Sequence, residues 1–107
     1  MSYNVENTDY FAKQFKRLAR KYPSLKNELG KLITSLETNP EQGTPIGKQC
    51  YKIRIAIASK GKGKSGGARV ITHVYIVRKT VYLISIYDKS EQANIPDSVI
   101  TSIINSL

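Results

Sequence analysis

Five residues have types and spacings that suit chemistry on a phosphate group. Lys52 and Arg54 stand two positions apart in one run of alternating apolar residues, Arg69 begins a second run, and Tyr87 and Lys89 end a third. Arginine presents a fixed, forked positive charge to phosphate oxygens. A lysine among other cations has a lowered pKa and can accept or release a proton, and a tyrosine hydroxyl can donate one. This set predicts phosphate binding.

The same residue types could also cleave RNA without a metal ion. The ribose 2′-OH would attack its own adjacent phosphate. That reaction requires a proton acceptor for the hydroxyl, a proton donor for the departing 5′ oxygen and positive charge around the phosphorus. The residue types alone indicate RNA contact and leave cleavage open.

The positive charge of the chain is concentrated in the same region. No acidic residue lies between Glu41 and Asp88, and this stretch holds nine of the 17 basic residues. The other basic residues are balanced by the eight acidic ones, so the net charge of +9 arises here. A concentrated positive field predicts a polyanionic partner, either nucleic acid or an acidic protein, although lysines can also serve only to keep a small protein soluble. The candidate RNA contacts around the five residues are Lys48, Lys60, Lys62 and Lys64.

Alternation with a period of two predicts a strand over residues 51–57. Its aromatic and β-branched residues alternate with Lys52, Arg54 and two alanines, so the first set faces a core and the second faces outward. Residues two apart on a strand lie roughly 7 Å from each other on one face. Lys52 and Arg54 therefore project side by side from a sheet.

Two further strands are predicted, over residues 69–77 and 81–87. Three sequential strands with short connections form an antiparallel meander. In the third strand, strict alternation places Tyr87 on the opposite side from Ile84 and Ile86. We expect the five residues described first to share one exposed face of this meander, with the lysine-rich loop at its rim.

Helical spacing predicts a helix pair before the meander. A short strand-prone piece at 3–6 and polar capping residues at 7–9 precede an amphipathic helix over residues 11–22. A second amphipathic helix over 24–36 follows at once, with Ser24 as its cap, and two such helices form a hairpin that lies on something flat. Prolines and glycines mark residues 39–47 as a loop.

A last helix is predicted from Asn94 onward. Its apolar stripe is exposed unless it docks on the sheet or on a partner, and it consists of Val99, Ile100, Ile103, Ile104 and Leu107. The predicted fold class is α+β, with an N-terminal strand, a two-helix hairpin packed on a mainly antiparallel sheet with a three-stranded meander, and a C-terminal helix. The chain is long enough for one hydrophobic core, so a single domain over residues 1–107 is expected.

Composition also bears on location and cofactors. The one cysteine, Cys50, cannot form an internal disulfide and has no metal-binding cluster near it, which suits a reducing cytosol. The chain begins without an apolar signal core, and no apolar run approaches the ~18 residues of a membrane span. We expect a cytoplasmic protein with no membrane contact and no metal or other cofactor.

Two other features could carry chemistry. The loop that ends in Lys64 and Ser65 matches a relaxed nucleotide-binding pattern, but such a loop needs a helix directly after it and residues 69–74 are β-rich. His73, the one histidine, could act as a general base near neutral pH. Its neighbours Ile71 and Tyr75 favour a packed structural role instead.

The region from Lys48 to Glu91 resembles the RelE toxin superfamily, specifically its HigB-like branch. The resemblance is carried by KIRIA at 52–56, SKGKGKSGGARVI at 59–71 and VYLISIYDKSE at 81–91. It implies a small α+β toxin of a bacterial toxin–antitoxin pair, with the RelE/ParE-like fold, that enters the ribosomal A site and cuts messenger RNA. No metal is used in that family. The implied partners are messenger RNA, the ribosome and a separate antitoxin that covers the active face in a hetero-oligomer.

The resemblance also implies roles for single residues. Lys52 and Arg54 match paired cations to which the family assigns proton transfer and phosphate binding. Arg69 matches an arginine assigned to stabilising the scissile phosphate, and Lys89 lies where RelE-type members often have arginine. Replacing either Lys52 or Arg69 by alanine should abolish toxicity. The fold should stay intact, because both side chains are expected to be exposed.

The general acid and base are left open by the resemblance. RelE-type members have a tyrosine shortly after the basic position at Lys89, and residues 90–94 contain none. Tyr87, in an Ile-Tyr signature that HigB-like members share, is the substitute that we predict, with His73 as the second choice.

Two other functions remain open at this point. ParE-like members of the same superfamily poison DNA gyrase by binding and do not cleave RNA. A basic domain could also bind RNA without catalysis, and such binding would be strongly salt-dependent. The clustering of Lys52, Arg54 and Arg69 favours the nuclease.

Overall fold

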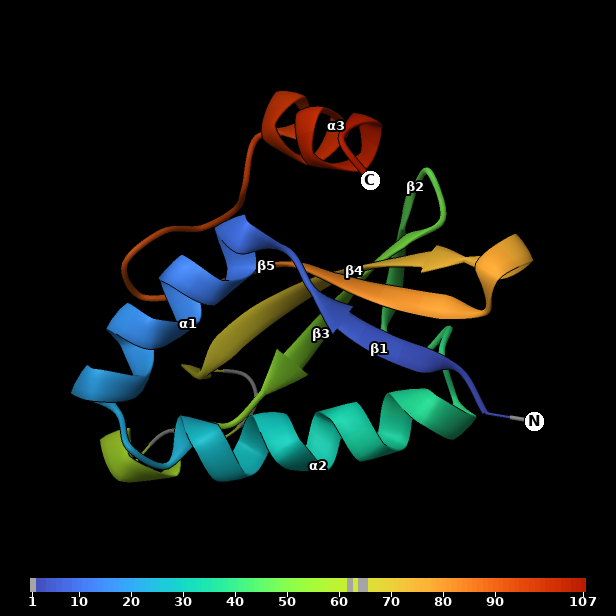
Figure 1. Cartoon of the computed structure of the whole chain (residues 1–107). Helices are drawn as coiled ribbons and strands as arrows, with labels where there is room; N and C mark the ends of the chain where they lie inside the picture. The colour runs from blue at the N-terminus through green and yellow to red at the C-terminus, as the bar shows by residue number, and fades with distance from the viewer. Residues whose placement is uncertain (1, 62, 64–65) are drawn as a thin grey trace.

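The computed structural model describes residues 2–61, 63 and 66–107, and these are organised around a five-stranded sheet (Figure 1). The strands are β1 (Asn4–Asn7), β2 (Thr44–Gly47), β3 (Cys50–Ile55), β4 (Ala68–Tyr75) and β5 (Thr80–Asp88). Their order across the sheet is β1-β5-β4-β3-β2. β1 pairs in parallel with β5, and the other pairs are antiparallel. The predicted α+β fold with a meander is therefore confirmed.

Within the described residues, three α helices lie on the two sides of this sheet. α1 (Asp9–Lys21) and α2 (Leu25–Thr38) form the predicted hairpin, and α3 (Asp97–Asn105) lies on the opposite side (Figure 1). The sheet face that α3 covers is thus separate from the face that the hairpin covers.

The two hairpin helices begin differently. The Thr8 side chain caps α1, because its Oγ1 accepts a hydrogen bond from the Phe11 amide at 3.2 Å. Ser24 occupies the cap position of α2 but makes no capping hydrogen bond. Its Oγ lies 2.9 Å from the Oγ of Ser59, so it ties the start of α2 to the chain beyond β3.

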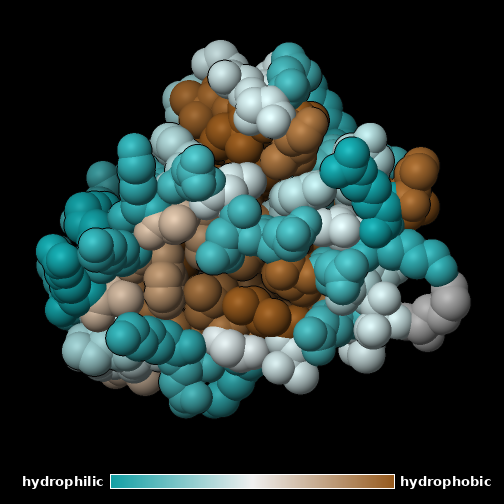
Figure 2. Space-filling model, viewed as in Figure 1, coloured by the Kyte–Doolittle hydropathy of each residue, from teal (hydrophilic) through white to brown (hydrophobic). Residues whose placement is uncertain are grey.

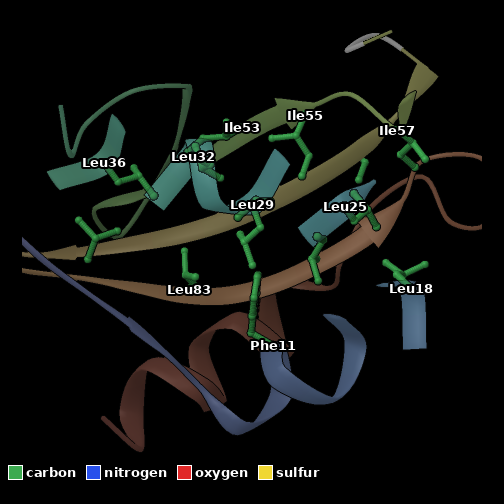
Figure 3. Close-up of a cluster of buried hydrophobic side chains, with 14 of the residues drawn as sticks. Phe11, Leu18, Leu25, Leu29, Leu32, Leu36, Ile53, Ile55, Ile57 and Leu83 are labelled. Atoms are coloured by element: carbon green, nitrogen blue, oxygen red, sulfur yellow. The ribbon is translucent and has the colours of Figure 1, made fainter. Parts of the chain in front are cut away.

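The larger hydrophobic core lies between the hairpin and the sheet (Figure 3). It combines residues of both helices with alternate residues of β3, β4 and β5: Phe11, Leu18, Leu25, Leu29, Leu32, Leu36, Ile53, Ile55, Ile57, Val70, Val74, Val81, Leu83 and Ile86. Full burial of one such side chain stabilises a fold by about 1.5–3 kcal/mol. This core therefore holds the hairpin on one face, and the opposite faces of β3 and β4 are left for other contacts.

The apolar stripe predicted for the last helix docks on that opposite face. Ile100 is buried in a second core with Ile71 and Ile84 of the sheet, and Ile95 joins them from the connection before α3. Other apolar residues of α3 are only half-buried, and Figure 2 shows apolar side chains at the surface of this helix at the top of the view.

The strict alternation predicted for the third strand of the meander is wrong. Thr72 pairs with Leu83 but Ile71 pairs with Ser85, so the register of β4 against β5 shifts between them. Ile84 is the extra residue of a β-bulge. A bulge adds one residue to one strand and reverses the faces of the residues after it.

The bulge changes the face of Tyr87. Tyr87 lies with Ile84 in the second core, whereas Ile86 belongs to the larger core. We predicted Tyr87 on the opposite side from Ile84, and the structure corrects this.

The predicted loop over 39–47 ends in an edge strand. β2 (Thr44–Gly47) pairs with β3 and is exposed throughout. Lys48 and Gln49 connect the two strands with φ of 56° and 59°, as a two-residue hairpin turn with both central residues left-handed requires. The sequence did not reveal β2, because Pro45 and Gly47 are turn-forming residues. Proline is nevertheless tolerated on an edge strand.

β4 begins at Ala68 and contains the segment 69–74 that was predicted to be β-rich, which argues against a nucleotide-binding loop. Directly before β4, Gly67 lies close against β3. A Cβ added at Gly67 would lie 2.2 Å from the Ile55 carbonyl oxygen, closer than any real contact.

Gly67→Ala should therefore destabilise the fold by about 3 kcal/mol, because main chain and not a flexible side chain would have to move. Gly30→Ala is the matched control, since its Cβ would meet open space on exposed α2 and should stabilise by up to about 1 kcal/mol. Urea unfolding of both variants measures these changes. A Gly67→Ala protein as stable as the wild type would contradict the close approach.

Candidate nucleic-acid interface

Strand pairing brings three of the predicted residues into one row. Arg54 on β3 pairs with Arg69 on β4, and Arg69 pairs with Tyr87 on β5. Directly opposite residues in an antiparallel sheet point to the same face, with Cβ atoms about 4.5–5.5 Å apart. Lys52 is two residues before Arg54 on β3 and shares that face. We call these four residues the cationic row.

The members of the cationic row differ in exposure. Arg54 is exposed and Lys52 is half-buried. Arg69 is only 7% exposed and Tyr87 only 1%. The expectation that Arg69 is exposed is therefore wrong.

The burial has two causes. Arg69 belongs to β4, the central strand of the sheet, and its Nη1 donates a hydrogen bond to the Ala68 carbonyl at 3.2 Å. Tyr87 is covered by the second core, which includes Ile95 and Ile100. Local alternation predicted the face of Arg69, whereas the face of Tyr87 depends on the bulge and its burial on a segment that follows β5 in sequence.

Asn94 joins the site, although the sequence indicated only that a helix starts there. Its Oδ1 accepts hydrogen bonds from Lys52 Nζ at 3.1 Å, from the Tyr87 hydroxyl at 3.5 Å and from the Ile95 amide at 3.0 Å. No periodicity marks this residue, because it lies in the irregular connection between β5 and α3.

The protonation of Tyr87 follows from its surroundings. Burial raises the pKa of the Tyr87 hydroxyl, and the positive charge of Arg69 offsets part of that rise. The hydroxyl therefore stays protonated at neutral pH. Of the two roles left open for Tyr87, proton donor suits this state and proton acceptor does not.

The predicted lysines outside the cationic row lie at two ends of the sheet. Lys48 is exposed in the β2–β3 turn, and its Nζ donates a hydrogen bond to Thr101 of α3. Lys89 is exposed just beyond β5, where its amide donates to the Gly67 carbonyl at 3.2 Å. Lys60 ends the 3-10 helix Ala58–Lys60. Lys62 and Lys64 lie outside the described residues.

His73 is packed and not placed in the cationic row. It lies four residues beyond Arg69 on β4, where it pairs with Cys50, and its Nδ1 lies 3.6 Å from the Cys50 sulfur. Burial lowers the pKa of His73, and a hydrogen bond with the Lys48 backbone partly opposes that. Cys50 is buried as predicted, and burial raises the pKa of its thiol to about 11. These features support the structural role for His73.

The family of the chain is shown by its match to a family model. Residues 9–103 match the model described as RelE toxin of RelE / RelB toxin-antitoxin system. The chain belongs to the RelE toxin family. The predicted membership of the superfamily is confirmed, and assignment to its HigB-like branch stays a prediction. This match identifies the chain as a toxin of a toxin–antitoxin system.

Solved structures of RelE toxins share the fold. A mutant of the Escherichia coli toxin RelE in the free state superposes with a TM-score of 0.67 at 18% identity, covering 100% of this chain and 99% of that one. The toxin–antitoxin complex RelBE2 from Mycobacterium tuberculosis gives 0.58 at 14% identity, over 88% and 95%. The intact E. coli RelBE complex gives 0.53 at 20% identity, over 81% and 96%. At these identities the likeness concerns the fold.

The described residues also bear on metal binding and on membranes. They contain no group of three or more His, Cys, Asp or Glu side chains placed to hold a metal ion. No helix in them has the length and apolar character that crossing a membrane requires.

His73→Gln should flatten the pH dependence of stability. Burial lowers the pKa of His73 in the folded state, so the unfolded chain binds the proton more readily and stability is lost as pH falls below the ordinary value of 6.5. The free energy of unfolding should fall more steeply between about pH 7 and pH 5 for the wild type than for the variant. Urea titrations at each pH measure the two slopes, and equal slopes would contradict the burial of a neutral imidazole.

Proposed function

We propose that this RelE-family toxin is a ribosome-associated, metal-independent endoribonuclease that cleaves messenger RNA and so inhibits translation. The cationic row is the observation that carries the proposal. Family membership supports a toxin, and a row of two arginines with a lysine and a tyrosine on one face supports RNA as its target.

The two arginines act on the phosphate. Arg54 is exposed and can bind the non-bridging oxygens directly with its forked guanidinium. Arg69 lies beside it on β4, where burial reduces the screening of its charge. Both charges stabilise the doubly negative phosphorus centre that forms when the 2′-OH attacks.

Tyr87 and Lys52 are the proton-transfer residues. Tyr87 is protonated at neutral pH and is assigned to the departing 5′ oxygen, as the general acid. Lys52 is the remaining proton-transfer residue on this face. We assign its neutral amine, formed when the ammonium has released a proton to solvent, to accept the proton of the attacking 2′-OH. Because Tyr87 is 1% exposed, its hydroxyl reaches RNA only when apolar side chains of the second core beside it move aside.

The proposed protein partner is an antitoxin. Two of the similar structures are toxin–antitoxin complexes, one from E. coli and one from M. tuberculosis. A net charge of +9 favours a partner with acidic segments over this face. From the sequence, the apolar stripe of the last helix could dock on the sheet or on a partner. Ile100 packs on the sheet, whereas Val99, Ile103 and Ile104 are only half-buried.

Lys52→Ala and Arg54→Ala should each lower cleavage of messenger RNA on ribosomes by about 100-fold, the usual cost of removing a proton-transfer group or an electrostatic stabiliser. Both side chains reach the surface, so both variants should keep the wild-type melting temperature. Arg69→Ala is a poorer test of catalysis than we expected from the sequence. Arg69 is buried, so its removal would also lower the stability of the fold. Lys26→Ala, on the exposed side of α2, is the matched control and should cleave normally.

Mapping of messenger 5′ ends after induced expression measures these effects. Ribosome-dependent cuts that disappear in both variants support the proposal. DNA breaks linked to gyrase would instead indicate ParE-like action, and salt-dependent RNA binding with no cuts would indicate a non-catalytic RNA-binding domain.

A further inference from the structure

We propose that Asn94 is a positioning residue of this site, which holds the Lys52 amine and the Tyr87 hydroxyl at one shared oxygen atom. The inference rests on the proposed function, because it concerns the two proton-transfer residues of that reaction. It assigns a role to a residue that neither the sequence pattern nor the family resemblance indicated.

Hydrogen-bond chemistry fixes which atom of Asn94 faces the site. The Lys52 ammonium and the Ile95 amide can only donate hydrogen bonds, and both lie within 3.1 Å of Asn94 Oδ1. An amide nitrogen in that place would meet donors only. The oxygen must therefore point at Lys52, and the Tyr87 hydroxyl at 3.5 Å donates to the same atom.

The orientation of Asn94 is set by its own segment and not by the residues that it holds. The adjacent Ile95 amide binds Oδ1, and Gln92 Nε2 donates to the main-chain carbonyl of Asn94 at 2.9 Å. The side chain is thus directed at the sheet by neighbours on its own connection. Lys52 and Tyr87 come from β3 and β5, two strands that β4 separates, and Asn94 spans them.

The connection between β5 and α3 is anchored on both sides of Asn94. On the side before Asn94, the Glu91 carboxylate forms ion pairs with Arg17 of α1 at 3.3 Å and with Lys21 at 3.6 Å. These exposed ion pairs are worth about 0–1 kcal/mol each. After it, Ile95 is 4% exposed in the second core, which supplies the stronger anchor.

The position of a proton-transfer group controls rate steeply, since a displacement of about 1 Å can cost about 100-fold. Without Asn94, the flexible Lys52 side chain and the Tyr87 hydroxyl both lose the oxygen atom that accepts their hydrogen bonds, so neither group is held in one orientation. Phosphate binding by Arg54 does not involve Asn94. Loss of Asn94 should therefore lower the rate of the cleavage step far more than the affinity for RNA.

The test compares Asn94→Ala and Asn94→Asp with Asn27→Ala, a control on exposed α2. Single-turnover cleavage on ribosomes carrying a defined messenger RNA separates rate constant from affinity. Asn94→Ala should slow cleavage at least about 10-fold with affinity changed less than about 2-fold. Asn94→Asp keeps an acceptor oxygen and should restore most of the rate, with its pH–rate profile moved to higher pH by the carboxylate beside Lys52 and Tyr87.

A second readout does not require RNA. The acceptor favours the protonated phenol, so Asn94→Ala should lower the pKa of Tyr87 in the free protein, followed by NMR of ¹³C-labelled tyrosine. The charged residues placed toward Tyr87 are Arg69 on β4 and Lys52 on β3, and neither is changed by the substitution.

The possible failures are distinguishable. If the wild type cleaves and Asn94→Ala cleaves equally well, the inference about Asn94 falls and the proposed function stands. If Asn94→Ala loses activity only in step with a lowered melting temperature and Asn94→Asp does not restore it, the residue is structural and the inference also falls. If the wild type does not cleave at all, the proposed function and this inference fall together.

Discussion

The register shift between β4 and β5 is the constraint on which the candidate site depends. Side chains alternate along a strand, so a slip of one residue moves every later side chain to the other face. The bulge at Ile84 is that slip, and it turns Tyr87 toward the face of Arg69 while Ile86 enters the larger core. Regular pairing through this point would have placed Tyr87 under the helical hairpin, away from the arginines.

The two faces of the sheet differ in function because the helical hairpin covers one face fully and α3 covers the other only in part. The hairpin buries a continuous set of leucine and isoleucine side chains and supplies most of the apolar burial. The opposite face is covered only in part, by α3 and the connection before it, so that Arg54 stays exposed while Arg69 and Tyr87 are enclosed. A charge enclosed beside an exposed one strengthens the field at the surface, and this is the arrangement that attack on a phosphate requires.

The sequence predicted what is local and failed where distant segments decide. Period-two alternation placed Lys52 and Arg54 on one face, because a strand of six residues determines its own faces. Three motifs between Lys52 and Glu91 together indicated the toxin family, which the family model confirms. The burial of Arg69 and the bulge could not be predicted, since both depend on residues brought in by the fold. Asn94 was missed for the same reason: an asparagine before a helix is ordinary, and the two side chains that donate hydrogen bonds to it, Lys52 and Tyr87, lie on two different strands.

Crosslinking of RNA to the ribosome-bound toxin would show whether messenger RNA lies across the face of β3 and β4 that carries the cationic row. Messenger RNA containing 4-thiouridine at the codon being read would be irradiated with the bound toxin, and the crosslinked peptides would be identified by mass spectrometry. We expect crosslinks within β3 and in the connection between β5 and α3, close to Lys52, Arg54 and Asn94. Crosslinks confined to the outer surface of α1 and α2 would contradict it.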